Sequence, residues 1–141
     1  MKSFFDETGG WPTLDKVHKV FYDKVYVHPW MKQFFLGVEQ KRIEQQQSNF
    51  MAAIFGGPKR YVGNSPKSAH LRMFITQELM DIRTQLLEES LLECRVSAPN
   101  RMIWLSKDKN FHSTILKKGH DEVVKRYATE EVLIIPRPPN C

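Results

Sequence analysis

The feature that most constrains this chain is an amphipathic stretch that ends at a glycine-rich loop. Ile43, Gln47, Phe50 and Ile54 recur at helical spacing, on one stripe of a helix expected from about Glu39 to Phe55. An amide buried without a partner costs about 1–3 kcal/mol, so Gln47 stands out among apolar neighbours. Two interpretations stay open: Gln47 reaches water at the stripe edge, or this face lines a pocket whose occupant accepts a hydrogen bond.

A long loop follows this helix and leads to a single histidine. Residues 56–66 contain three glycines and two prolines, and Gly56-Gly57-Pro58 stops the preceding helix. A short helical turn at Lys67–Leu71 is expected to carry His70. A lone histidine is most often a surface or a satisfied core residue, so His70 becomes a functional candidate only because other features converge on it.

Further helices are expected on both sides of this stretch, and the fold class is all-α. Thr13 can cap a helix that Pro29 ends, Thr76 caps a second helix, and Ser97 begins a third. The apolar stripes are Leu14, Val17, Phe21 and Val25; Ile75, Leu79, Ile82 and Leu86; and Met102, Ile103, Leu105, Phe111 and Ile115. The apolar and proline-rich segment Val132–Pro139 is expected to be either a strand-like arm packed on the body or a frayed end.

Composition excludes several classes of function. No run of about eighteen apolar residues occurs and the N-terminal segment is polar, so we expect no membrane span, no signal peptide and a cytoplasmic location. The net charge of +5 is dispersed among acidic residues, so no nucleic-acid partner is expected. Two cysteines fit a reducing compartment, and the five histidines include no i, i+4 pair that would favour a zinc site on a helix.

Taken in order, these residues resemble the truncated (2-on-2) haemoglobin family, most closely its first group. The motifs that carry the resemblance are Gly9-Gly10, Phe21-Tyr22, His28-Pro29, Phe34-Phe35, Gln47, Phe50, Gly56-Gly57-Pro58, Tyr61, Gly63 and His70. The resemblance implies a globin-like two-over-two helical sandwich around haem b. It covers about Gly9 to Phe111, and we expect a globin domain over residues 1–127 with a separate tail at 128–141.

The resemblance also implies roles for individual residues. His70 matches the proximal ligand of the haem iron, Phe35 and Phe50 match aromatic residues that pack on the porphyrin, and Tyr22 and Gln47 match the distal polar residues. Bound O₂ carries partial negative charge and accepts hydrogen bonds. A phenol with a pKa near 10 keeps its proton at neutral pH and can donate one.

The chain departs from the family pattern at several positions. Ile43 is apolar at a distal position where some members have glutamine or histidine. Gln46 and Lys117 replace two histidines of certain cyanobacterial members, one that binds iron internally and one that bonds covalently to haem. Ile82 and Arg83 lie where the second group of the family has a large tryptophan.

Further cofactor contacts are expected at the mouth of the pocket. Haem propionates need cationic or hydroxyl partners, for which Tyr61 and Arg72 are candidates, together with Lys59 and Arg60. Phe74 is a candidate haem contact or a core residue.

The function implied by the resemblance is reversible binding of O₂, CO and NO. It leaves open whether the protein also detoxifies NO by dioxygenation, which needs an external reductase. The alternatives are a haem-based gas or redox sensor, or an interaction module without turnover, whose tail at Val132–Pro139 contacts a partner. Weaker alternatives are peroxidase-like or sulfide chemistry and a haem-free helical module.

Overall fold

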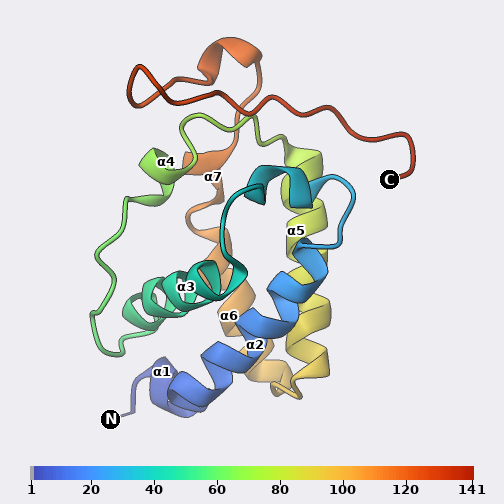
Figure 1. Ribbon diagram of the computed structural model, residues 1–141. Helices are drawn as coiled ribbons and strands as arrows, with labels where there is room; N and C mark the ends of the chain where they lie inside the picture. The colour runs from blue at the N-terminus through green and yellow to red at the C-terminus, as the bar shows by residue number, and fades with distance from the viewer. Residues whose placement is uncertain (1) are drawn as a thin grey trace.

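The computed structural model describes residues 2–141, and every regular element in that part of the chain is helical (Figure 1). The elements are α1 (Phe4–Glu7), α2 (Gly10–Val25), η1 (Met31–Phe35), α3 (Gln40–Ile54), α4 (Pro66–Ala69), α5 (Gln77–Glu93), α6 (Ala98–Lys109), α7 (His112–Ile115) and η2 (His120–Glu122). The all-α prediction is confirmed. None of the described helices is both long and apolar enough to span a membrane.

Two pairs of helices form the body. α2 packs mainly against α3 and α5, and α5 packs against α6, which gives a layer of α2 and α3 over a layer of α5 and α6 (Figure 1). The residues with at most 1% exposure that fill the space between the layers include Leu14, Val17, Met51, Leu91 and Trp104. Burying side chains of this size contributes about 1.5–3 kcal/mol each, so this core fixes how the two layers cross.

Local capping signals place several helix boundaries. α3 lies within one residue of its expected ends. The Thr76 hydroxyl accepts from the Leu79 amide, and the Ser97 hydroxyl accepts from the Asn100 amide, as their sequence positions predicted.

The predicted cap at Thr13 was wrong. The cap is Gly9, four residues earlier, because Gly9 takes a left-handed conformation (φ +111°) that lets the chain turn directly into the helix at Gly10. At its other end α2 ends at Val25 and not, as the sequence predicted, at Pro29.

The apolar stripe predicted for the last long helix was also wrong in part. Met102 is 73% exposed, whereas Trp104 and Asp108, four residues apart, face inward. The chain breaks after Lys109 and resumes as α7.

The tail forms an arm packed on the body, and it is not a frayed end. The Leu133 amide donates to the Arg72 carbonyl (2.7 Å), and the Phe74 amide donates to the Leu133 carbonyl (2.8 Å), which makes a parallel bridge between Met73 and Leu133. The Trp30 indole donates to the Ile135 carbonyl at 2.8 Å. The arm therefore runs across the segment that joins α4 to α5 (Figure 1).

Candidate functional site

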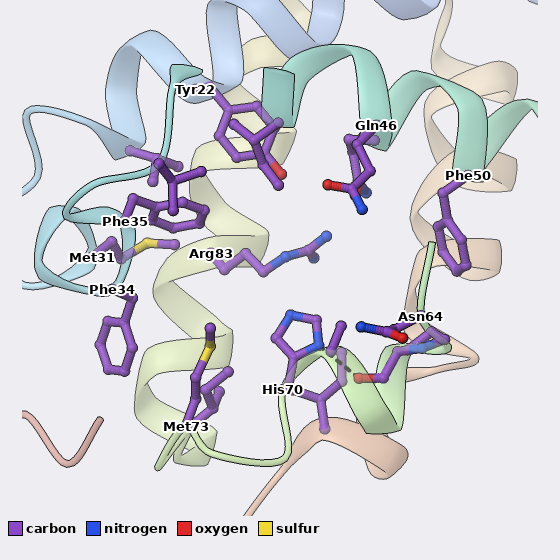
Figure 2. Close-up of a pocket in the computed structure, with 18 of the residues that line it drawn as sticks. Tyr22, Met31, Phe34, Phe35, Gln46, Phe50, Asn64, His70, Met73 and Arg83 are labelled. Atoms are coloured by element: carbon purple, nitrogen blue, oxygen red, sulfur yellow. Dashed lines mark hydrogen bonds between the residues drawn. The ribbon is translucent and has the colours of Figure 1, made fainter. Parts of the chain in front are cut away.

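A cavity of about 660 Å³ opens between α2, α3, α5 and the segment around α4. Its wall is largely aromatic and aliphatic, with a few polar groups at separate points (Figure 2). The lining residues discussed below are Tyr22, Phe35, Glu39, Arg42, Ile43, Gln46, Gln47, Phe50, Tyr61, His70, Arg72, Arg83 and Arg126. A concave apolar wall with few converging polar groups is typical of a cofactor site.

His70 is the imidazole that faces this cavity, directly after α4. Its Nδ1 donates to the Pro66 carbonyl at 2.7 Å, which leaves Nε2 as the unprotonated nitrogen without a partner among residues 2–141 (Figure 2). Burial lowers the pKa of His70 to about 4, so the ring is neutral at pH 7. A neutral imidazole oriented through its other nitrogen is the form that binds a metal ion.

Tyr22 lies across the cavity from His70, on α2 (Figure 2). The residue is only 6% exposed, and its hydroxyl, which lines the cavity, has no hydrogen-bond partner within the described chain. Burial raises the pKa of the Tyr22 phenol above its usual range. The hydroxyl therefore remains protonated and is free to donate to an occupant of the cavity.

The expected stripe of α3 lines the cavity at three of its four positions. Ile43, Gln47 and Phe50 are lining residues, as is Gln46, whereas Ile54 packs in the core. The Gln47 amide has no hydrogen-bond partner within residues 2–141, which supports the interpretation that it faces a pocket. Its neighbour Ser48 faces the core instead, where its hydroxyl bonds to His18 Nδ1 at 2.7 Å.

Two phenylalanines stand at separate places on the wall. The ring of Phe35 packs edge-on against Tyr22, with centroids 5.9 Å apart. The ring of Phe50 packs edge-on against Tyr61 (5.1 Å) and Phe111 (5.5 Å). Because each ring is fixed by aromatic neighbours, both present rigid apolar surface to the cavity.

Basic residues of the lining are held by the chain beyond α7. Glu130, 6% exposed, lies 3.1 Å from Arg72 Nε and forms an ion pair with Arg126. The Arg72 guanidinium also donates to the Glu131 carbonyl at 3.1 Å. One buried carboxylate thus lies beside two guanidinium groups of the cavity wall. It is hydrogen-bonded to Arg126, whereas Arg72 Nε has no hydrogen-bond partner among residues 2–141 and its contact with Glu130 is one of charge.

Three of the sequence candidates lie away from the cavity. Lys59 is exposed, and the Arg60 guanidinium lies 4.8 Å from the centre of the Trp11 ring. Phe74 is absent from the cavity wall among the described residues, and its ring packs against His120, with centroids 4.6 Å apart. Tyr61 and Arg72, in contrast, do line the cavity.

Sequence reasoning did not select three arginines of the lining, Arg42, Arg83 and Arg126. Arg83 lies four residues after the buried Leu79, so helical periodicity already placed a cation on an inward face of α5. Arg126 lies beyond the motifs and carried no comparable signal.

Comparison with known proteins agrees with this arrangement. Residues 3–117 match the family model described as "Bacterial-like globin". A "Group 1 truncated hemoglobin" of Nostoc commune is 26% identical over 118 residues, which cover 84% of this chain and all of that protein. A "Group 1 truncated hemoglobin" of Tetrahymena thermophila is 28% identical over 93 residues, which cover 66% of this chain and 77% of that protein.

Solved structures show the same fold. The truncated hemoglobin of Tetrahymena pyriformis, Fe(III) form, superposes with a TM-score of 0.77 at 23% identity, over 83% of this chain and all of that one. The 2/2 hemoglobin of Synechococcus sp. PCC 7002, with covalently attached heme, superposes with a TM-score of 0.75 at 24% identity. The superposition covers 82% of this chain and 98% of that one.

The two-layered helical fold and its cavity define a haem-binding globin. The chain belongs to the bacterial-like globin family, and the predicted resemblance to truncated haemoglobins of the first group is confirmed.

Proposed function

We propose that this globin binds O₂, and also NO and CO, reversibly at a haem b held in the cavity. The observation that carries the proposal is the opposition of two unpaired groups across one apolar space: the Nε2 atom of His70 and the hydroxyl of Tyr22. When bound, the haem iron supplies the coordination position for a diatomic ligand.

The residues present fit such a group. The hydrogen bond to Pro66 fixes His70 as the tautomer with a free Nε2, which we assign as the proximal ligand. Phe35 and Phe50 offer flat apolar surface for the porphyrin. Tyr61 and Arg72 are our candidates for the propionates, joined by Arg126.

The distal residues favour a polar ligand over an apolar one. The neutral Tyr22 hydroxyl donates a hydrogen bond, and Gln47 either donates to the same ligand or orients the phenol. Each such bond in a site without bulk water is worth on the order of 1 kcal/mol or more. Ile43 offers no acid or base at its position, so it gives no support to peroxidase-like or sulfide chemistry.

Absorption spectra test the proposal directly. Ferric, reduced and CO-treated protein should show an intense Soret band that shifts on CO binding. No Soret band after addition of hemin would overturn it. His70→Gly should abolish the normal five-coordinate ferrous spectrum.

Whether the protein also detoxifies NO is a separate part of the proposal. In that reaction O₂ and NO combine to nitrate, and an external reductase restores the ferrous state. Stopped-flow mixing of the oxygenated protein with NO should give rapid formation of nitrate. Slow or absent nitrate formation would limit the protein to ligand binding.

The alternative function, a sensor or interaction module that uses its tail, loses its main support. The arm at Val132–Pro139 is engaged with the body through Arg72, Phe74 and Trp30.

We infer a cytoplasmic location from the two free cysteines, Cys94 and Cys141.

A further inference from the structure

Arg83 is a charged side chain inside the cavity that the proposed haem ligand and distal residues do not explain. It projects from α5 between Tyr22 and Gln46 on one side and His70 on the other (Figure 2). Its guanidinium carbon lies 5.7 Å from the centre of the Phe21 ring, on the same helix as Tyr22. The cation therefore stands beside the α2 wall, where we place the gas ligand.

A buried carboxylate fixes the orientation of this guanidinium. Asp108, 1% exposed, accepts from Arg83 Nη1 at 2.6 Å and from Nη2 at 3.0 Å. His112 Nε2 lies 2.7 Å from the same carboxylate. Burial alone would raise the pKa of Asp108, but the charge of Arg83 and the hydrogen bonds from His112 and Arg83 hold it well below its usual range. The carboxylate is therefore ionised and the two-pronged contact is permanent at neutral pH.

The contact with Asp108 leaves donors of Arg83 unused. A guanidinium carries five N–H groups, and Asp108 takes two of them. No other side chain or carbonyl among residues 2–141 accepts from Arg83. Since Asp108 does not line the cavity, its negative charge lies behind the guanidinium, and the face toward the cavity is cationic.

Other charges on the wall do not cancel this cation. Glu39 is the acidic lining residue in the described chain, and it is exposed. Arg72 and Arg126 are engaged with Glu130, and Arg42 is exposed. Burial is the main cause of the raised pKa of the Tyr22 phenol, and the charge of Arg83 acts in the opposite direction.

We propose that Arg83, held by Asp108, makes the distal side of this pocket a binding site for a small monovalent inorganic anion of the azide or nitrite type. The inference rests on the proposed haem site. The anion receives hydrogen bonds from the free N–H groups of Arg83 and from the Tyr22 hydroxyl, whereas CO, which carries no charge, gains little from the cation.

Spectroscopic titration of the ferric, haem-loaded protein with sodium azide tests this site. Charge-assisted hydrogen bonds are worth roughly twice neutral ones, so Arg83→Gln should raise the azide Kd by about tenfold or more. The affinity of the ferrous protein for CO should change by less than about threefold, because CO carries no charge. Arg83→Lys keeps the charge and should retain part of the azide affinity.

Two controls separate a specific cation from net charge and from damage to the fold. Arg60→Gln removes the same charge from an exposed arginine away from the cavity and should leave the azide Kd nearly unchanged. The double variant Arg83→Met/Asp108→Leu replaces the pair by apolar groups, a change that buried ion pairs often tolerate, and should lose azide affinity as Arg83→Gln does.

Equal azide affinities in the unmodified protein and the double variant would overturn the inference, as would parallel losses of azide and CO affinity. Failure of the haem assignment is recognised separately, by the absence of a Soret band in the unmodified protein, and it would remove the inference with it.

Discussion

The ammonium group of Lys117 donates a hydrogen bond of 2.7 Å to the carbonyl oxygen of His70. It also donates to the carbonyls of Met73 (2.9 Å) and Ile115 (3.0 Å), and the residue is 9% exposed. The resemblance places Lys117 where certain relatives attach haem covalently through histidine. Here the same position ties the backbone of the proposed proximal ligand to α7.

Lys117→Met should loosen the segment that carries His70. Three carbonyls lose a hydrogen bond from a charged donor, although those of His70 and Met73 keep their backbone amide donors. A hydrogen bond to a charged group contributes about 1.5–3 kcal/mol. We expect the rate of haem transfer to excess apomyoglobin to rise several-fold. Lys118→Met changes an exposed neighbour and should leave the rate unaltered; equal rates in all three proteins would show that the tie does not hold the site.

Tyr22→Phe should raise the dissociation rate of O₂. Loss of one hydrogen bond of on the order of 1 kcal/mol corresponds to about fivefold, and a larger effect is expected where water is excluded. Stopped-flow or flash photolysis measures the rate. Tyr26→Phe is the matched control, since Tyr26 does not line the cavity and its hydroxyl already donates to the Val38 carbonyl at 2.8 Å. An unchanged rate in Tyr22→Phe would mean that the phenol does not reach the ligand.

Glu130→Gln should weaken the hold on Arg72 and Arg126. Removing a buried charge partner destabilises the groups left behind, so faster haem loss and a lower Tm are expected. The neighbouring exposed carboxylate serves as the control, because Glu131→Gln leaves the backbone carbonyl used by Arg72 in place. If the two variants behaved alike, the ion-pair cluster would have no part in retaining haem.

His18 should make the protein sensitive to acid. Burial lowers its pKa to about 3 from an ordinary 6.5, so between these pH values the unfolded chain binds a proton that the folded chain does not. Stability from this group therefore falls as pH falls, by about 3 kcal/mol between pH 7 and pH 4.

His18→Gln should flatten that dependence by about the same amount. Urea unfolding at pH 7, 5.5 and 4 measures it by circular dichroism. His120→Gln, at an exposed histidine, should follow the unmodified protein. Parallel curves for His18→Gln and the unmodified protein would contradict the prediction.

Much of the fold was predictable because its signals are local. The caps at Thr76 and Ser97 bond to amides three residues away, and the spacing of Ile43, Gln47 and Phe50 depends only on helical geometry. The errors in the predicted fold arose where contacts with residues distant in the sequence determine which side chains are buried. Which face of α6 is covered depends on packing against other helices, so Met102 looked buried in the sequence and is exposed.

The site divides in the same way. Tyr22, Gln47 and His70 lie on motifs of known spacing, and all three line the cavity. Helical spacing placed Arg83 on an inward face of α5, but its ion pair could not be foreseen, because Asp108 lies 25 residues later and on another helix. The position of Arg126 on the cavity wall depends on how the C-terminal segment crosses the body, and no sequence pattern in that segment predicts its path.

The arm has a consequence for the order in which the pocket is completed. Leu71, Arg72 and Phe74 receive backbone partners from Val124 and Leu133, and Arg126 comes from the same stretch. A ribosome makes those partners only after the whole helical body. The helical body can therefore fold during synthesis while the segment that bears His70 still lacks its backbone hydrogen bonds to Val124 and Leu133. We expect firm binding of the prosthetic group to be a late, post-translational step.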